Sequence, residues 1–337
     1  MKPTTEPSRI PILIAALLGL FAAAGHAADF PLPPPGQAVI GKVLRVQTRY
    51  EDTLSDIARK YDLGYREIVA ANPGVDPWLP GKGAVITVPT RFILPPGPRT
   101  GIVINLAELR LYYYPPGEDR VVTHPLGIGR EGWATPTGNM HIVAKKPNPS
   151  WRVPKSIREE HAARGDILPE VVPPGPDNPL GRYALRLNRT QYLLHGTNQP
   201  WGVGMRVSHG CIRLYPEDIE ALFPRVSVGT PVRIINQPYK VGWFGDTLFV
   251  EAHPPLSEQL GAEGNNLTPL VKAIITAYGD AKPGALNWKR VQRIALEQTG
   301  VPTPLNRVLA HNGSGPGREK RASLPGFMSM ERALDLP

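Results

Sequence analysis

The hydrophobic pattern between residues 43 and 89 changes from alternation to a helical repeat and back to alternation. Residues 43–47 (VLRVQ) alternate between apolar and polar, as a half-buried strand does. The apolar positions that follow, spaced i, i+3, i+4 and i+7, are Leu54, Ile57, Ala58 and Tyr61. This spacing predicts an amphipathic helix, which Asp52 or Thr53 can cap at its start.

A second helix is predicted for the segment YREIVAANPG, with a stop at residues 72–74 (NPG). Residues 84–89 (AVITVP) then form a closing strand. The order strand, helix, helix, strand predicts a small compact unit at residues 43–90. A proline-rich spacer at 28–42 precedes it, and such spacers are extended and semi-rigid.

From Gly101 onward the pattern consists of short β-rich runs separated by glycine and proline. The runs are IVIN, LRLYYYP, VVTHPLGIG, MHIVA, YALRL, YLLHG and VRIIN. Short strands with such punctuation favour a β-sandwich or a barrel-like sheet. The longest helix predicted in this region covers residues 216–226. Residues 145–181 are too long for an ordinary connection, so we expect this insertion to be a functional loop or lid.

Residues 238–305 predict a small α/β subdomain after the β-rich region. A strand or hairpin is expected at 241–255, followed by helices at 267–279 and 287–300. The apolar stripe of the first helix is Leu270, Val271, Ile274, Ile275 and Tyr278. The remaining residues, 306–337, are polar and glycine-rich over most of their length, which is typical of a mobile tail.

The chain opens with the features of a secretory signal peptide at residues 1–27. A lysine and an arginine provide the positive start, and an apolar run of 15 residues follows, shorter than the roughly 20 that span a bilayer. Small residues at Gly25 and Ala27 predict cleavage before Ala28. We therefore expect a mature periplasmic protein without stable membrane insertion. An uncleaved membrane anchor is the alternative.

The net charge of the chain limits the classes of partner that it favours. The formal net charge is +9 at pH 7, and removal of residues 1–27 takes away two basic residues and one acidic residue, which leaves +8. A basic exported protein favours anionic partners such as lipid head groups or cell-wall polymer. Export, together with the lack of basic runs interleaved with aromatic residues, argues against nucleic acid as a partner.

The sequence contains one cysteine, Cys211, within HGTNQPWGVGMRVSHGCIRL. It cannot form an internal disulfide, so in an exported protein it is an intermolecular partner, a reactive thiol or a buried small residue. A thiol attacks a carbonyl as the thiolate and needs a base, and two histidines are candidates. His209 shares a face with Cys211 if the segment is extended, whereas His195 ends a predicted strand sixteen residues upstream.

The neighbours of Cys211 suit the same chemistry. Gly210 lets the backbone approach a substrate, amides beside Cys211 can hold an oxyanion, and Arg213 supplies a fixed positive charge. Zinc would need three or four protein ligands at characteristic spacings, and the chain has one cysteine and no H-E-x-x-H motif. We therefore expect no metal and no cofactor.

The two motifs HGTN…SHGCIRL and GREGWATPTGNMHI (129–142) make residues 98–237 similar to the catalytic domain of the L,D-transpeptidases, also called the YkuD family. The resemblance implies that Cys211 is the nucleophile and that His195 is the proton acceptor and donor. It implies that His209 helps to hold the site. Supporting roles are implied for Ser208, Gly210 and Arg213.

Residues 43–90 resemble a LysM module, through EDTLSDIARKY, IVAANPGVDPWLPGKG and VITVP. Such modules bind N-acetylglucosamine-containing glycans such as peptidoglycan; a spacer that binds nothing is the alternative. The resemblance implies glycan contacts at Asp52, Thr53, Leu54, Asn72, Pro73 and Gly74. The expected fold class is a mostly β catalytic domain of the YkuD sandwich or barrel type, with a small βααβ LysM domain and a small α/β C-terminal subdomain.

The resemblance also implies a reaction on peptidoglycan. Cys211 attacks the diaminopimelate–D-alanine bond of a tetrapeptide stem, and an amine resolves the thioester. The amine belongs to another stem, which gives a 3→3 cross-link, or to a lysine of an outer-membrane lipoprotein. Alternatives are a hydrolase of the same family, a wall-cleaving cysteine peptidase and a non-catalytic peptidoglycan-binding protein. Such peptidases usually place cysteine before histidine, whereas His195 precedes Cys211, and an intact set of His195, His209 and Cys211 argues against a non-catalytic protein.

Overall fold

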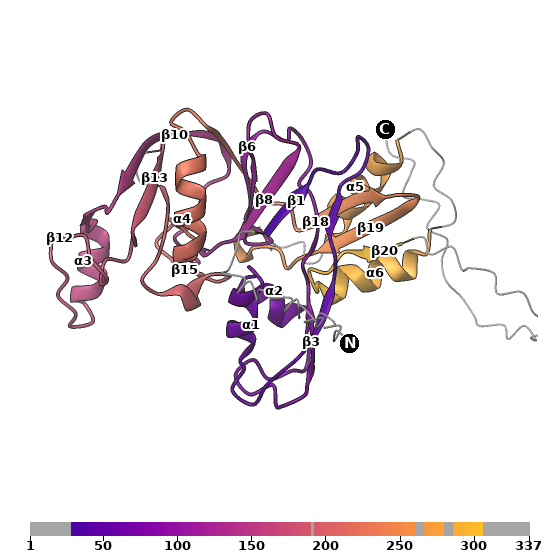
Figure 1. The fold of residues 1–337 in the computed structure, drawn as a ribbon, viewed down its shortest axis with the longest axis horizontal. Helices are drawn as coiled ribbons and strands as arrows, with labels where there is room; N and C mark the ends of the chain where they lie inside the picture. The colour runs from indigo at the N-terminus through magenta and orange to yellow at the C-terminus, as the bar shows by residue number, and fades with distance from the viewer. Residues whose placement is uncertain (1–27, 190–191, 260–265, 280–285, 306–337) are drawn as a thin grey trace, which may run out of the picture. The chain divides into compact units, whose positions relative to one another are not determined.

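The computed structural model describes residues 28–189, 192–259, 266–279 and 286–305 of the chain (Figure 1). The predicted leader at 1–27 and the predicted tail at 306–337 lie outside the described residues. Among the helices of these ranges, none combines the length and the apolar character that a bilayer span requires.

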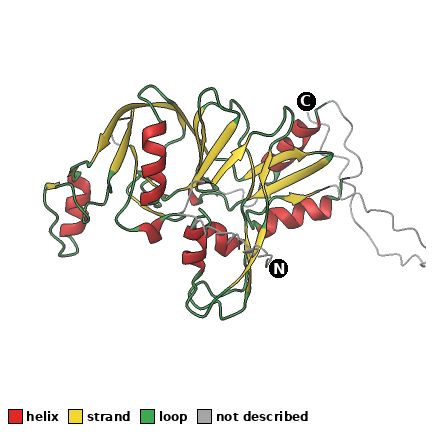
Figure 2. Cartoon of the chain, viewed as in Figure 1, coloured by secondary structure: helices red, strands yellow, loops and turns green. Residues whose placement is uncertain are grey.

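A nine-stranded sheet is the largest element of the fold (Figure 2). In spatial order its strands are β1 (Ala28–Pro31), β8 (Arg120–Pro125), β7 (Arg110–Tyr114), β6 (Gly101–Asn105), β17 (Pro231–Ile235), β10 (Gly138–Pro147), β13 (Tyr183–Leu187), β14 (Leu193–His195) and β16 (Ile212–Arg213). Neighbouring strands are antiparallel except in the pairs β6–β17 and β14–β16, which are parallel. β10 serves both halves of the sheet, because its first four residues pair with β17 and the rest with β13. A register shift between Ile142 and Ala144 marks the point where the sheet curls.

The helix α4 (Pro216–Arg225) packs along β13 and covers the core of this sheet (Figure 2). Ile219 and Leu222 of α4 are buried in one hydrophobic cluster with Leu194 of β14 and Ile212 of β16. Burial of each such side chain stabilises the fold by roughly 1.5–3 kcal/mol. Since α4 begins shortly after β16, this packing fixes the end of that strand.

The predicted order strand, helix, helix, strand is confirmed for the N-terminal unit. Its elements are β3 (Leu44–Gln47), α1 (Leu54–Lys60), α2 (Tyr65–Ala70) and β4 (Val85–Val88), and β3 and β4 pair antiparallel. Thr53 caps α1, because its hydroxyl accepts a hydrogen bond from the Asp56 amide at 3.1 Å and the Asp56 carboxylate accepts one from the Thr53 amide at 3.3 Å. The predicted face is buried at Leu54, Ile57 and Ala58 and half-buried at Tyr61, which is already the C-cap.

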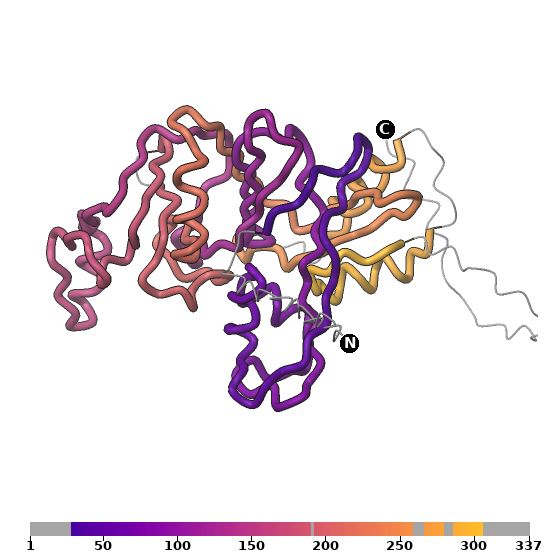
Figure 3. Tube along the Cα trace, in the orientation of Figure 1, coloured from indigo at the N-terminus to yellow at the C-terminus, as the bar shows by residue number. Residues whose placement is uncertain are grey.

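The 145–181 insertion contains a helix, α3 (Lys155–Ala162), and a short ladder of β11 (Trp151–Arg152) with β12 (Val171–Val172). Figure 3 follows this excursion as a continuous tube away from the large sheet. It leaves at the end of β10 and returns at the start of β13, where Pro147 is paired with Tyr183. The two ends of the insertion therefore meet at one rung of the sheet.

The C-terminal subdomain combines a three-stranded sheet with two helices. Its elements are β18 (Tyr239–Phe244), β19 (Thr247–Ala252), β20 (Thr303–Pro304), α5 (Thr268–Tyr278) and α6 (Trp288–Glu297). Leu270 and Ile274 of α5 are buried as predicted, but Ile275 is 61% exposed. The prediction of a buried Ile275 was wrong, because this residue lies about 140° around the helix from Leu270 and faces away from β18.

The remaining short elements join the larger ones. They are β2 (Val39–Gly41), β5 (Arg91–Ile93), β9 (Ile128–Gly129), η1 (Pro200–Gly202), β15 (Arg206–Ser208) and η2 (Ser257–Gln259). β2 pairs with β5, and β9 pairs in parallel with β15. The second pairing brings the GREGWATPTGNMHI segment to the chain just before Cys211.

Candidate active site

Cys211 lies immediately before β16, and β16 pairs in parallel with β14. In this register Leu194 is opposite Ile212, and His195 is opposite Arg213. Leu194 and Ile212 point into the hydrophobic core. Because successive side chains of a strand alternate between faces, His195, Arg213 and Cys211 share the opposite face. The sheet therefore places His195 in β14 and Cys211 directly before the neighbouring strand β16, toward the same face.

The environment of His195 fixes both its tautomer and its charge. Its Nδ1 lies 2.6 Å from the carbonyl oxygen of Gly196, and a carbonyl can only accept, so Nδ1 carries the proton. Nε2 is then the nitrogen with the free electron pair. Burial, followed by the charge of Arg213, lowers the pKa of His195 to about 3. The imidazole is therefore neutral at pH 7 and able to accept a proton.

The thiol of Cys211 is also in its neutral form in this arrangement. Burial raises the pKa of Cys211 above its ordinary value, and this effect outweighs the backbone of Leu193 and the charge of Arg213, which both lower it. A preformed thiolate–imidazolium pair is thus disfavoured. A neutral thiol beside a neutral imidazole is an arrangement in which proton transfer and nucleophilic attack can occur in one step.

The loop before Cys211 is held by hydrogen bonds to two hydroxyl groups. Ser208 Oγ donates to the carbonyl of Cys211 at 2.6 Å and accepts from the amide of Gly210 at 3.2 Å. Thr135 Oγ1 donates to the carbonyl of Gly210 at 2.9 Å and accepts from the amide of Gly129 at 3.1 Å. The Gly210 amide is therefore used by Ser208, and it can meet an oxyanion only after giving up that bond.

Gly210 has a conformation that glycine favours. Its φ is +102°, and an added Cβ would lie 3.1 Å from Cε1 of Tyr192. Both the backbone and the neighbouring ring therefore favour the absence of a side chain here. Arg213 is largely buried, and its Nε has no hydrogen-bond partner among the described residues. A buried guanidinium with this spare donor suits an anionic group or a developing oxyanion.

His209 is held from the 145–181 insertion. Its Nε2 lies 3.0 Å from Glu160 Oε2 and 3.2 Å from a terminal guanidinium nitrogen of Arg130. A carboxylate only accepts and a guanidinium only donates, so Nε2 finds a partner in either tautomer of the ring. Arg130 pairs with the same oxygen of Glu160 at 2.5 Å, and this contact, first among its causes, lowers the pKa of Glu160 to about 2. The ring of Trp133 packs edge-on to His209 at 4.9 Å. These partners give His209 a positioning geometry, while His195 has the geometry of a base.

Glu160 and Thr135 were missed by sequence reasoning. Glu160 follows Glu159 in a polar helix, and no local pattern separates the two. Thr135 lies in the segment 129–142, whose resemblance to the family was noted without assigning it a role.

The predicted glycan contacts divide into two groups. Leu54 is fully buried, and the buried side-chain amide of Asn72 donates to the carbonyls of Ile68 and Thr87 at 2.7 and 2.8 Å. Thr53 caps α1. These three residues have structural roles in the unit. Asp52, Pro73 and Gly74 are half-buried or exposed and remain available.

An aromatic pair in the same unit, the exposed Trp78 and the half-buried Tyr65, was missed by the sequence analysis. Trp78 is 58% exposed, and its ring stacks on that of Tyr65 with centroids 6.0 Å apart. Exposed aromatic rings of this kind have an apolar face and a polar edge, which suits contact with sugars.

Two buried groups of side chains in the described part of the chain have the composition of metal ligands. They are Glu108, Glu251 and His253, and Asp62, His124 and Asp218. In the first group the ammonium of Lys240 pairs with Glu251 at 2.9 Å and with Glu108, so a cation is already present. The second group contains no lysine or arginine head group.

The fold and the site define a YkuD-type catalytic domain with a LysM domain on its N-terminal side. A family profile described as the L,D-transpeptidase catalytic domain matches residues 99–234, and the LysM domain profile matches residues 47–77. The curated protein "Probable L,D-transpeptidase YcfS" of Escherichia coli K12 is 43% identical over 284 residues, which cover 82% of this chain and 88% of that protein. "Probable L,D-transpeptidase YbiS" of the same strain is 39% identical over 298 residues, covering 85% and 94%.

The chain therefore belongs to the L,D-transpeptidase family and is a transpeptidase. Among solved structures, the NMR structure of the catalytic domain of the E. faecium L,D-transpeptidase is similar, at 24% identity and a TM-score of 0.31. The matched region covers 40% of this chain and 96% of the E. faecium domain.

Proposed function

We propose that this protein is a periplasmic peptidoglycan L,D-transpeptidase that uses Cys211 as nucleophile and His195 as general base and acid. The observation that carries the proposal is the register of β14 and β16, which puts a neutral His195 and the Cys211 thiol on one sheet face beside Arg213. The leader at residues 1–27 supports export, and the basic charge supports an anionic wall polymer as partner.

The first half-reaction forms a thioester. The Cys211 proton passes to His195 Nε2 as Sγ attacks the carbonyl carbon that joins diaminopimelate to D-alanine. The charge that develops on the carbonyl oxygen is stabilised by the positive environment of Arg213. The C–N bond then breaks, and D-alanine leaves with the proton that His195 returns to its nitrogen.

The second half-reaction regenerates the thiol. An amine attacks the thioester carbon and loses a proton to His195, a new amide bond forms, and Cys211 leaves with that proton. The acceptor is an amine of another stem or a lysine of an outer-membrane lipoprotein. Water in the place of the amine would give a hydrolase.

The LysM domain has the role of holding the enzyme on its polymer. Binding through one unit raises the local concentration of stems around the catalytic domain. Asp52, Pro73 and Gly74, with the aromatic pair Trp78 and Tyr65, form the surface that we propose for the glycan.

The test of the nucleophile is intact-protein mass spectrometry with a carbapenem. Such a compound acylated the E. faecium L,D-transpeptidase, whose solved structure is described as acylated by ertapenem. The protein should gain the mass of one ertapenem, and Cys211→Ser should gain none on the same timescale. An adduct of equal yield on Cys211→Ser would contradict the proposal.

The acceptor is identified by analysis of muropeptides after incubation of the protein with tetrapeptide stems. A 3→3 linked dimer indicates transpeptidation between stems, and release of D-alanine without a dimer indicates hydrolysis. Addition of a lysine-terminated peptide tests the lipoprotein-type acceptor.

A further inference from the structure

We propose that the pocket around Asp62 binds the α-ammonium group of Ala28, which is created when the leader is removed. This inference rests on the proposed cleavage before Ala28 and goes beyond the transpeptidase reaction. Hydrolysis of the Ala27–Ala28 peptide bond consumes one water, leaves a carboxylate on Ala27 and frees an amine on Ala28. An α-amine has an ordinary pKa of about 7.7–8.0, so at pH 7 most of it is protonated.

Ala28 already lies at this pocket. It begins β1, the edge strand of the large sheet, where it is paired with Thr123 of β8. Its backbone nitrogen is 2.8 Å from Asp62 Oδ2. Asp62 follows α1 in the LysM unit and has a φ of +54°, a left-handed conformation that is uncommon outside glycine. The first residue of the proposed mature chain and a buried carboxylate are thus in direct contact.

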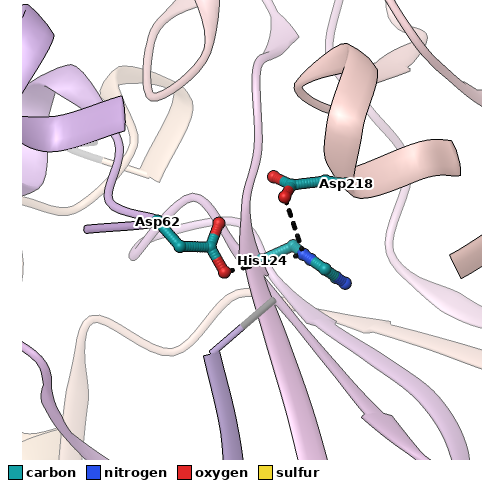
Figure 4. Close-up of side chains that lie close together, drawn as sticks. All are labelled: Asp62, His124 and Asp218. Carbon is teal, nitrogen blue, oxygen red and sulfur yellow. Dashed lines mark ion pairs between the residues drawn. The ribbon is translucent and has the colours of Figure 1, made fainter. Parts of the chain in front are cut away.

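Two further buried residues complete the pocket, His124 of β8 and Asp218 of α4 (Figure 4). His124 Nδ1 is 3.7 Å from Asp62 Oδ2 and 3.3 Å from Asp218 Oδ1. Several buried atoms here have no hydrogen-bond partner among the described residues: Asp62 Oδ1, Asp218 Oδ2 and both ring nitrogens of His124. The two carboxylate oxygens are acceptors, and a neutral His124 ring adds one acceptor and one donor, so the pocket has room for a further donor.

In the described part of the chain, no lysine or arginine head group forms an ion pair with the two carboxyl groups of this pocket. Burial raises the pKa of Asp62 well above its ordinary value and that of Asp218 to about 7. Burial also lowers the pKa of His124, which leaves this ring neutral. Arg110 lies beside the pocket, but it forms a two-point pair with Glu67 at 2.8 and 2.9 Å. Its hydrogen bond to Asp62 reaches only the backbone carbonyl.

An α-ammonium supplies the cation that lets Asp62 ionise inside the protein, and the peptide N–H that it replaces does not. The peptide nitrogen has one proton and no charge, whereas the ammonium has three protons and a positive charge. A buried carboxylate needs such a partner, because an unpaired buried charge is strongly unfavourable. Ala28 begins the mature chain, Asp62 belongs to the LysM unit, and Asp218 belongs to α4, the helix that follows β16. Leader removal therefore links these three parts of the protein through one buried cluster of charges.

The first test measures whether the α-amine is engaged, in a protein that needs no substitution. Two chains are prepared by cleavage of an N-terminal fusion, one beginning at Ala28 and one with a single glycine before Ala28. Both are treated with 2-pyridinecarboxaldehyde, which labels α-amines, and the adduct is followed by intact mass. We expect the amine of the Ala28 chain to react at least about tenfold more slowly than that of the glycine-extended chain, because labelling requires local opening. Equal rates in the two folded chains would overturn the proposal.

The second test is a thermodynamic cycle. The added glycine should lower the melting temperature of the parent by about 5 °C or more, because it moves the charge out of the pocket. In Asp62→Asn the same glycine should have little effect, because the carboxylate partner is gone. An equal loss in both backgrounds would mean that the glycine acts by bulk alone, and would overturn the proposal. If Asp62→Asn does not fold, the labelling comparison still decides.

A divalent metal is the competing occupant of this pocket. Metal analysis of the Ala28 chain, with melting measured before and after addition of EDTA, distinguishes the two. Stoichiometric metal that is lost in Asp218→Asn, with a melting temperature that EDTA lowers, would overturn the proposal. Metal-free protein whose melting is unchanged by EDTA supports the α-ammonium. The intact mass of the exported protein shows separately where the leader is cleaved. If cleavage occurs at another residue, the labelling result on the chain that begins at Ala28 still stands.

Discussion

Glu160 and His209 are 49 residues apart in the chain, and their side chains meet at 3.0 Å. Glu160 belongs to α3 of the 145–181 insertion, and His209 lies two residues before Cys211. The carboxylate of Glu160 therefore ties the insertion to the loop before Cys211, and Arg130 pairs with the same carboxylate. This contact gives the predicted loop or lid a direct route to the site.

Glu160→Gln should slow acylation of Cys211 by a carbapenem by about tenfold, because His209 and Arg130 lose their shared carboxylate. The melting temperature of this variant should change little, since the side chain of Glu160 is partly exposed to solvent. Glu159→Gln is the matched control, because Glu159 pairs with Lys155 on the same helix. The measurement is the rate of adduct formation by intact mass. Equal rates for the two variants would contradict a positioning role for Glu160.

The pH profile of acylation should stay flat as pH falls from about 8 to about 5. His195 is the neutral base in the proposed mechanism, and with a pKa lowered to about 3 it remains neutral over this range. A base with the ordinary histidine pKa of about 6.5 would instead lose activity below that value. A profile that falls with a midpoint near pH 6.5 would contradict the assignment.

Arg213→Gln should move the acid limb of that profile to higher pH. The charge of Arg213 is second to burial in lowering the pKa of His195, so its removal lets the imidazole protonate more readily. A purely structural effect would lower the rate at every pH without moving the limb. Arg182→Gln, at an exposed position, is the control and should leave both rate and limb unchanged.

Gly210→Ala should destabilise the protein by about 1–2 kcal/mol more than Gly132→Ala. Both glycines have positive φ, +102° and +80°, so both variants carry the backbone strain of about 1 kcal/mol. Only at Gly210 does the new methyl meet a ring, that of Tyr192 at 3.1 Å, whereas nothing lies within 4 Å at Gly132. Chemical denaturation of both variants measures the difference, and equal losses would show that Tyr192 moves aside freely.

Trp78→Ala should weaken binding of the full chain to purified sacculi by about three- to tenfold, the loss of one stacked ring. Trp288→Ala is the control, because Trp288 is also exposed, at 47%, but lies in the C-terminal subdomain. Sedimentation with sacculi over a concentration series gives both affinities. A larger loss for Trp288→Ala would move the glycan surface away from the LysM unit.

Much of the fold follows from local sequence patterns, because the buried residues of each element repeat with its own period. Apolar residues that repeat with a period of 3.6 predicted α1 through Leu54 and Ile57, and the capping residue Thr53 marks the start of this helix. Ile275 was wrongly assigned to the buried face, because the stripe of five apolar residues is broader than the face that α5 buries. The sequence cannot show how wide that face is, since the width depends on β18, which packs against it.

The sequence singles out the candidate residues Cys211 and His195 through a distinctive motif, and their catalytic roles stay a prediction. The residues that contact the candidate site could not be predicted. Glu160, Asp62 and His124 acquire their partners only when distant segments come together. The direction of the thiol pKa was equally invisible, because the burial that raises it comes from the folded sheet around Cys211.

The paired rung of Pro147 and Tyr183 has a consequence for how this enzyme can vary. Since the 145–181 insertion leaves and re-enters the sheet at that rung, its length does not set the spacing of the strands on either side. Doubling such a loop costs only about 0.6 kcal/mol in closure entropy. Grafting a different insertion between these two residues would replace Glu160, and with it the contact to His209, while the strands on either side stay in register.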